Sequence, residues 1–332
     1  MSELSELADS VFGDAWNATA SGLDTTLWAT LEETGLARLT LPGEAGGSGG
    51  TYTDAAELLT GAGRLAARVP LVETDWLAGW LLHAAGVALP EGPLSAVLAP
   101  HLTVEADVAY GILPRVPWGR AVAGVVALTG DRMVLVDPSD ARVIEGTNVA
   151  EEFRDTLILD RAPATVATVS AEVTAQFALR AALGRALLLA GAAHGALAMS
   201  VRYATERVQF GRPIAKLQAI QQPLALAGAE VAAAAAASQA AAREVDRIGF
   251  DDAELAIAVA KSRCGQAAGQ VARIAHQVHG AIGFTREHDL RLVTTRLWAW
   301  RDEDGAEETW NERLGARALD SGPAGLWPLL VG

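Results

Sequence analysis

The 332-residue sequence contains a single cysteine, Cys264, so no disulfide can form within the chain. This low cysteine use fits a reducing compartment, and we interpret Cys264 as a core residue because it lies in a helical-looking segment. No apolar run of about 18 residues, the length of a membrane span, is free of charged or polar interruptions. The opening MSELSELADS is acidic and lacks the apolar core of a signal peptide, so a cytoplasmic location is expected.

Positive charge is also scarce, with 26 Lys and Arg against 40 Asp and Glu and a net charge of −14. A broad nucleic-acid-binding face, which needs clustered Lys and Arg, is therefore excluded. The glycine-rich stretch GEAGGSGG suggests a phosphate-binding loop as one interpretation, but we interpret it as a flexible connection between helices. His276 and His279 lie three residues apart but without a carboxylate or cysteine at metal-ligand spacing, so no metal site is expected.

Three patterns divide the chain. In residues 1–92, periodic apolar positions predict a helical domain of short helices. Residues 93–165 contain short β-type runs separated by Pro, Gly and Asp, which predict a small β domain. Residues 166–332 are rich in alanine and almost continuously helical, which predicts a tightly packed bundle. The sequence therefore predicts a mainly α fold with a small β domain in the middle.

The long helical part is interrupted at RYATERVQFGRPIAKLQAIQQ, residues 202–222. Pro213 fits the first turn of a second helix, so one interpretation is a plain helical hairpin turn. The other is a ligand-binding shelf, because arginine, amide side chains and the backbone N–H groups of a turn suit a diphosphate. A second glycine-rich helix end, QVHGAIGFTREHDLRL at 277–292, makes the shelf the better interpretation.

Together these two segments resemble the acyl-CoA dehydrogenase family, and the likeness extends over most of the chain. The resemblance implies a helical domain, a small β domain and a C-terminal four-helix bundle. It also implies an oligomer, in which turns such as these contact the FAD of a neighbouring subunit. The residues at the matching positions are Arg207, Phe210, Gln218, Gln277, Gly280 and Ala281. Ala281 replaces a family glycine, which could narrow the approach of the backbone to the cofactor.

The family reaction removes hydrogen from the two carbons next to an acyl-CoA thioester, and it needs a carboxylate base opposite the flavin. Alignment from the glycine-rich turn places Asp304 at the position of the family glutamate, with Glu303 just before it. Aspartate is one methylene shorter, and a displacement of about 1 Å is costly in catalytic geometry. A second family position for the base falls near Ala181, where this chain has no carboxylate. The alternative is that Asp304 and Glu303 are exposed acids at a helix end.

The β domain lacks the T-E-P-x-x-G-S-D-like segment with which the family lines its flavin and acyl chain. In its place stands YGILPRVPWGRAVAG, where Trp118 could stack on a ligand or fill the core, and Arg115 or Arg120 could meet a phosphate. Shortened chains of this kind are similar to one subunit type of actinobacterial heterotetramers that act on steroid side chains. Two functions remain open: an FAD-dependent acyl-CoA dehydrogenase, as a homo-oligomer or within a heterotetramer, or a non-catalytic subunit that completes the flavin site of a second such chain.

Overall fold

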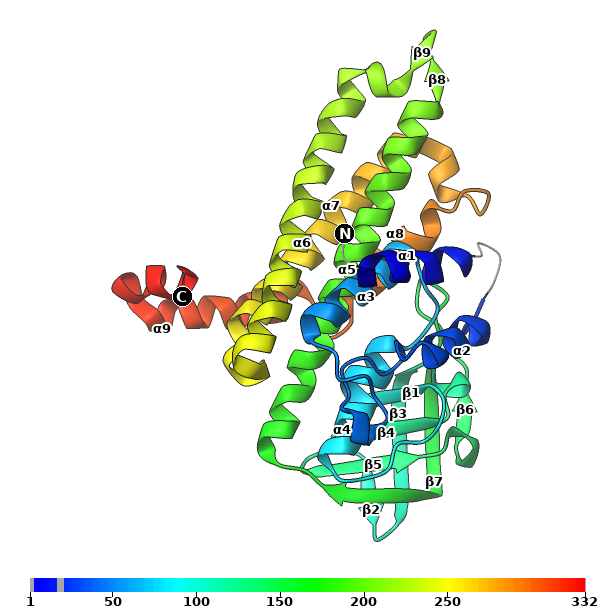
Figure 1. Ribbon diagram of the computed structural model, residues 1–332, viewed down its shortest axis with the longest axis vertical. Coiled ribbons are helices and arrows are strands. Elements are labelled where there is room, and N and C mark those ends of the chain that lie inside the picture. The colour runs from blue at the N-terminus through cyan, green and yellow to red at the C-terminus, as the bar shows by residue number, and fades with distance from the viewer. Residues whose placement is uncertain (1–2, 17–20, 332) are drawn as a thin grey trace.

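The computed structural model describes residues 3–16 and 21–331 of the chain. Helices form both ends of this part and strands its middle, so the predicted mainly α fold with a small β region is confirmed. Figure 1 shows a long helical bundle that carries the sheet at one end, with the first helices where the two meet. The division into domains at residues 92 and 165 remains our proposal.

The N-terminal helices begin at residues that satisfy their free N–H groups. The Asp24 carboxylate accepts a hydrogen bond from the Leu27 N–H at 3.0 Å, and Thr51 and Asp54 form a capping box. The helix that begins near Glu73 is partly a π-helix, a rare form that is frequent at functional sites. The elements are α1 (Glu3–Asp14), α2 (Thr25–Glu33), η1 (Gly43–Ala45), α3 (Tyr52–Arg64), the π-helical η2 (Val72–Gly79) and α4 (Trp80–Ala84).

The middle of the chain forms one mixed sheet in the order β1-β4-β5-β7-β3-β2, with β6 also paired to β7. β1 runs parallel to β4, whereas the other pairs are antiparallel. The inward side chains of this sheet, Leu113, Val134 and Leu157 among them, form a core of their own. The strands are β1 (Leu94–Leu98), β2 (Thr103–Glu105), β3 (Val108–Pro117), β4 (Gly124–Thr129), β5 (Arg132–Val136), β6 (Arg142–Ile144) and β7 (Arg154–Thr168); η3 (Gly119–Ala121) and η4 (Pro138–Asp140) lie between them.

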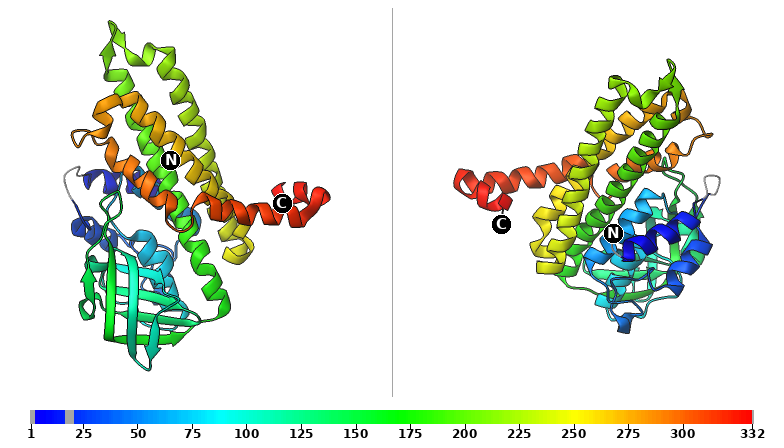
Figure 2. Two further views of the ribbon diagram at one scale, coloured as in Figure 1. Left: turned by 180° about the vertical axis from the view of Figure 1, so that it is seen from behind. Right: turned by 45° about the horizontal axis from the view of Figure 1, so that its top comes forward.

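The C-terminal part is built on long helices, of which α5 has 36 residues and α6 has 35. At about 1.5 Å per residue, each is on the order of 50 Å long. The views in Figure 2 show that α9 projects away from the bundle. The elements are α5 (Ala171–Glu206), β8 (Val208–Gln209), β9 (Arg212–Pro213), η5 (Ile214–Lys216), α6 (Gln218–Asp252), α7 (Glu254–His279), η6 (Gly280–Phe284), α8 (Leu290–Asp302) and α9 (Glu307–Val331).

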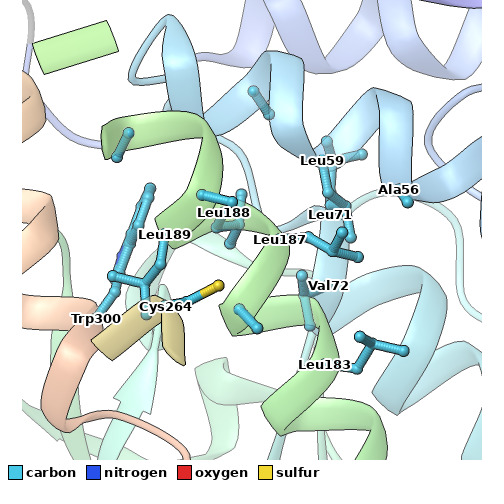
Figure 3. Packing of buried hydrophobic residues seen from close by; sticks show 14 of the residues in the cluster. Ala56, Leu59, Leu71, Val72, Leu183, Leu187, Leu188, Leu189, Cys264 and Trp300 are labelled. Atoms are coloured by element: carbon cyan, nitrogen blue, oxygen red, sulfur yellow. The ribbon is translucent and has the colours of Figure 1, made fainter. Parts of the chain in front are cut away.

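Helix α5 is the central helix of the core, and glycines let it approach α3 closely. A Cβ on Gly191 would lie 2.1 Å from the Thr60 carbonyl oxygen, and one on Gly63 would lie 2.2 Å from the Leu188 carbonyl oxygen. Figure 3 shows α5 leucines such as Leu187 against the apolar side chains of the N-terminal helices. The close approach explains why small residues are so frequent here. Cys264 is buried in the same core, as expected.

Among the described residues, helices α5 and α6 are long and apolar enough to meet the criterion for a membrane span. The absence of an uninterrupted apolar run therefore does not by itself exclude a membrane span. The apolar window of α5 is 72% buried within the protein and that of α6 is 22% buried. The core helices of soluble proteins pass the same test. Burial accounts for the apolar character of α5. The solvent-facing positions of α6 are mostly alanines and glutamines.

Candidate functional site

The break between the long helices is a β-hairpin and not a helical turn. Pro213 lies in β9, and α6 begins only at Gln218, so the expectation that proline starts the second helix is wrong. Phe210 and Gly211 both have positive φ, 53° and 74°, as a type I′ hairpin turn requires. Positive φ is uncommon for a residue other than glycine. The hairpin therefore holds Phe210 at its tip, where the side chain is 86% exposed.

The predicted shelf residues of this first segment are all accessible. Arg207 follows the last residue of α5, and Gln218 is the first residue of α6, on the other side of the hairpin. The side chains of Arg207, Phe210 and Gln218 are exposed. The sequence thus places a guanidinium, an aromatic ring and an amide on one small projection at the end of the bundle.

The second predicted segment is the end of α7. Gly280 has φ 64° and ψ −144°, a conformation that only glycine adopts readily, although a Cβ there would meet no other atom within 4 Å. The requirement is therefore conformational and not steric. Gln277, Gly280 and Ala281 are all exposed. Figure 1 shows this turn and the β8–β9 hairpin at the end of the bundle that lies away from the sheet.

The main cavity of the described chain lies far from those turns, between the sheet, α5 and the α8–α9 connection. Its volume is about 740 Å³, within the usual size range for small-molecule sites. Both predicted acids line it, as does Ala181 at the alternative base position, where no carboxylate is offered. Its charged lining residues are Arg115, Arg154, Arg185 and Arg313, with Glu73, Asp302, Glu303 and Asp304.

Glu303 is held by two arginines inside this cavity. Its carboxylate accepts hydrogen bonds from Arg154 at 2.8 and 2.9 Å and from the Asn148 amide at 3.1 Å, and it lies 3.5 Å from Arg185. Burial acts to raise the pKa of Glu303, but the two guanidinium charges outweigh it and lower the pKa to about 2. A carboxylate with so low a pKa has little tendency to take a proton from a substrate.

Asp304 is held by one arginine and a constrained backbone. Arg185 Nε donates to its carboxylate at 2.8 Å, while its side chain keeps 26% exposure. Its φ is 57°, and Trp310 Nε1 donates to its carbonyl oxygen at 3.1 Å. Lys261 Nζ, itself buried, donates to the carbonyl oxygens of Arg301 at 2.9 Å and Gly305 at 2.6 Å. The connection that carries both acids is thus fixed on both sides of Asp304.

The same arginines continue into a buried charge network that links the N-terminal, β and C-terminal parts of the chain. Arg185, on α5, also donates to Glu73 of η2 at 3.0 Å. Burial acts to lower the pKa of Arg185, but the charges of Asp304, Glu303 and Glu73 raise it well above its ordinary value. Arg154, at the start of β7, donates to Glu152 at 3.1 Å, and Glu152 also accepts from Trp300 Nε1 at 2.9 Å. The N-terminal helices, the sheet, α5 and α8 therefore share one ionic cluster.

The three candidate ligand-contacting residues of the β domain, Trp118, Arg120 and Arg115, lie in different environments. Trp118 is 3% exposed and packs with Phe153, so it is a core residue. Arg120 stacks over the Phe153 ring at 3.8 Å and lies 3.6 Å from the Asp155 carboxylate, so it is engaged internally. Only Arg115 of this trio lines the main cavity.

The histidines of α7 are buried aromatic partners. His276 stacks between Phe284 and Trp298 with ring centroids 4.2 and 5.1 Å apart, and its Nε2 lies 3.0 Å from Thr294 Oγ1. His279 stacks on Tyr203, and burial lowers its pKa to about 4. In the described part of the chain, no three His, Cys, Asp or Glu side chains gather as a metal site.

The arginines that hold the acids were not among the residues predicted from the sequence. Arg185 lies within the apolar run FALRAALGRALLLAG, and a charged residue there must be buried and needs an acidic partner. That pattern was a usable signal. Lys261, which directly follows the apolar run AIAVA, carried the same signal, whereas Glu73 and Arg154 lie close to other charged residues in the sequence and gave none.

Comparison with known proteins gives consistent matches. Residues 172–319 match the family described as acyl-CoA dehydrogenase, C-terminal domain. The acyl-CoA dehydrogenase IpdE2 of Mycolicibacterium smegmatis is 30% identical over 286 residues, which cover 83% of this chain and 82% of that protein. The acyl-CoA dehydrogenase FadE34 of Mycobacterium tuberculosis is 33% identical over 315 residues, which cover 91% of this chain but 42% of FadE34.

Solved structures agree with these matches. A variant of the steroid acyl-CoA dehydrogenase Tcur3481-Tcur3483 has a TM-score of 0.85 at 25% identity and covers 96% of this chain and 97% of that chain. The ChsE4-ChsE5 complex from Mycobacterium tuberculosis has a TM-score of 0.85 at 21% identity, covering 97% of this chain and 99% of that chain, which shows the shared fold.

Proposed function

Because the chain belongs to the acyl-CoA dehydrogenase family, we propose that it acts as one subunit of a heteromeric, FAD-dependent acyl-CoA dehydrogenase in which another chain supplies the catalytic base. The reaction of the assembly is the α,β-dehydrogenation of an acyl-CoA thioester. This chain contributes cofactor-binding turns and a ligand cavity. A cytoplasmic location is part of the proposal.

One observation carries the assignment of the base to another chain. Both acids that could remove the α-proton are engaged by arginines: Glu303 by Arg154 and Arg185, and Asp304 by Arg185 at 2.8 Å. A general base must present a free lone pair to the proton it abstracts and have a pKa near the working pH. Glu303, with a pKa of about 2, fails the second condition. Asp304 would first have to leave Arg185.

The exposed turns fit a diphosphate cofactor. Arg207 offers a guanidinium, Gln218 and Gln277 offer amides, and Gly280 leaves its backbone open because no Cβ covers it. Bound FAD would supply the hydride acceptor of the reaction. These turns lie at the end of the bundle away from the main cavity, which supports a cofactor held against a neighbouring chain (Figure 1). The assembly is thus a dimer or tetramer.

The relatives support a second, different chain as the neighbour. Two solved structures of this fold carry paired names, Tcur3481-Tcur3483 and ChsE4-ChsE5, and the first is named a steroid acyl-CoA dehydrogenase. FadE34 matches this chain over only 42% of its own length. These observations favour a heteromer over a homo-oligomer. They also favour an acyl-CoA with a steroid-derived acyl group as the substrate.

The second candidate function makes this chain catalytic, with Asp304 as its base. Its support is that the Asp304 side chain lines the main cavity, keeps 26% exposure and contacts only one arginine among the described residues. In this alternative the Arg185–Asp304 ion pair opens when the substrate enters.

The test is expression of the chain alone and together with the acyl-CoA dehydrogenase-like chain encoded beside it. Flavin absorbance and mass are measured first, and flavin bleaching by acyl-CoA is then compared for wild type, Asp304→Asn, Glu303→Gln and the double variant. We expect FAD to be retained on co-expression and bleaching to persist within about threefold in Asp304→Asn, since a lost general base typically costs about 10²–10⁴-fold.

Asp302→Asn is the matched control, because Asp302 lines the same cavity one residue before the acids, is exposed and has no ion pair with a described residue. Flavin content and circular dichroism confirm that each variant is assembled. If Asp304→Asn abolishes bleaching in a fully flavinated assembly while Asp302→Asn does not, the base resides in this chain and the proposal is wrong.

A further inference from the structure

We propose that Arg115 is a ligand-recognition residue of the main cavity, and that it binds an anionic group, a phosphate or a carboxylate, of the CoA thioester that this cavity accepts. The inference rests on the proposed function for the identity of the ligand. It adds a specificity-determining residue at a place where the characteristic family segment is missing from the sequence.

The backbone of β3 is irregular at Arg115, and this irregularity sets the direction of the side chain. Arg115 has φ 54°, in the left-handed region that few residues other than glycine adopt. It lies where the register of β3 against β7 shifts, since Leu113 pairs with Leu157 but Val116 pairs with Asp155. One extra residue on β3 makes a β-bulge, a device that is over-represented beside active sites because it redirects a side chain.

Prolines stiffen the bulge. Pro114 precedes Arg115 directly and Pro117 follows two residues later, so two backbone φ angles of this short stretch are fixed by pyrrolidine rings. Both prolines also line the cavity. The positive φ of Arg115 costs conformational free energy, and an ordinary strand could expose the same side chain to water without this cost. A role in ligand binding explains why the strained conformation is kept at the cavity wall.

Charge balance singles out Arg115 among the cavity cations. Arg154 pairs with Glu303 at 2.8 Å, Arg185 pairs with Asp304 at 2.8 Å, and Arg313 pairs with Glu254 at 3.4 Å. The Arg115 side chain forms no hydrogen bond, ion pair or ring contact with any residue that the structure describes. Within residues 3–16 and 21–331, Arg115 is therefore the one arginine of the cavity lining that does not pair with a carboxylate.

The cavity suits a ligand of this class. Its volume of about 740 Å³ accommodates a drug-sized molecule, and apolar side chains such as Leu77, Phe177 and Trp298 share its lining with the charged groups. Asp302 also lines it, and no ion pair joins it to Arg115 among the described residues. A ligand with an apolar body and an anionic group matches this combination, and a guanidinium binds both phosphate and carboxylate through paired N–H groups.

The experiment measures equilibrium binding to the purified co-expressed assembly, so it does not depend on which chain supplies the base. Three probes separate the two anion sources: coenzyme A, butyryl-CoA and glutaryl-CoA, whose free carboxylate butyryl-CoA lacks. The variants are Arg115→Met and Arg115→Lys. The control is Arg142→Met, on β6, which removes an exposed arginine that does not line the cavity.

We expect Arg115→Met to weaken binding about tenfold, the lower part of the range for a charge-assisted hydrogen bond, because the site is open to water. Arg115→Lys should restore part of the loss, and Arg142→Met should change nothing. An equal loss for all three probes assigns a CoA phosphate, whereas a loss for glutaryl-CoA alone assigns an acyl carboxylate. Unchanged dissociation constants for all three probes, with the assembly and its flavin intact, would overturn the proposal whatever the fate of the proposed function.

Discussion

The strongest stability prediction concerns Arg185, the central cation of the buried charge network. Methionine replaces the apolar stem of this arginine but lacks the guanidinium, so the substitution removes the partner of Glu73 and of Asp304. Glu303 keeps Arg154 at 2.8 Å. The substitution therefore leaves one deeply buried carboxylate, that of Glu73, without a cation.

The magnitude follows from burial. The side chains of Arg185 and Glu73 are 5% and 4% exposed, and removing one partner of such a pair typically costs about 3–5 kcal/mol. Glu73→Gln should cost less, about 1.5–3 kcal/mol for a charge-assisted hydrogen bond, because Arg185 keeps its two other carboxylates. Asp304→Asn should cost about 1 kcal/mol or less, since this side chain is 26% exposed and water screens the pair.

The assay is urea unfolding of the co-expressed assembly at one fixed protein concentration, with circular dichroism as the signal. The expected order of destabilisation is Arg185→Met, then Glu73→Gln, then Asp304→Asn. Arg142→Met serves as the control for the loss of one exposed arginine. The reasoning is refuted if Asp304→Asn destabilises as much as Arg185→Met, or if Arg185→Met matches the control.

Three further predictions concern other parts of the chain. Arg207→Ala should lower the FAD content of the purified assembly without unfolding it. Flavin absorbance per protein measures this, and Arg243→Ala, which removes an exposed arginine near the other end of α6, is the control. Light scattering should give a dimer or tetramer, and a flavin-bound monomer would contradict the cross-chain shelf. Burial lowers the pKa of Lys261 from 10.5 to about 8. Between these two pH values the unfolded state binds more protons than the folded state, so the free energy of unfolding should rise with pH in this range. Urea unfolding at several pH values should show this rise for the wild type and not for Lys261→Met.

Composition and periodicity were sufficient for the architecture because each part of the chain has one dominant pattern. Short runs of apolar, β-favouring residues such as RMVLV predicted β5, and the alanine-rich runs predicted α5 to α7. The glycine at the end of α7 could be recognised from local sequence, and Gly280 has the positive φ of 64° that favours this residue. The hairpin at Phe210 was not foreseen, because type I′ turns normally carry glycine or asparagine at that position.

The environment of the predicted acids could not be derived in the same way. Their sequence neighbours are exposed and polar, so Glu303 and Asp304 suggested a solvated helix end. The residues that set their chemistry come from elsewhere: Arg154 is 149 positions away and Arg185 is 119 positions from Asp304. Only tertiary packing brings such partners together and makes the two acids members of an ionic cluster.

The separation of the shelf from the cavity explains how a subunit of this family can lose its base and still be needed. The turns at Arg207 and Gly280 lie at the far end of the bundle from the cavity of the same chain (Figure 1), so in the proposed heteromer the two surfaces would serve different active sites. Changes around Asp304 alter only the chain's own cavity. They leave intact the turns that we propose to hold the cofactor of the neighbour. In a heteromer the cavity is then free to acquire arginines such as Arg185, which stabilise the fold, while the partner's chemistry continues to depend on this chain's shelf.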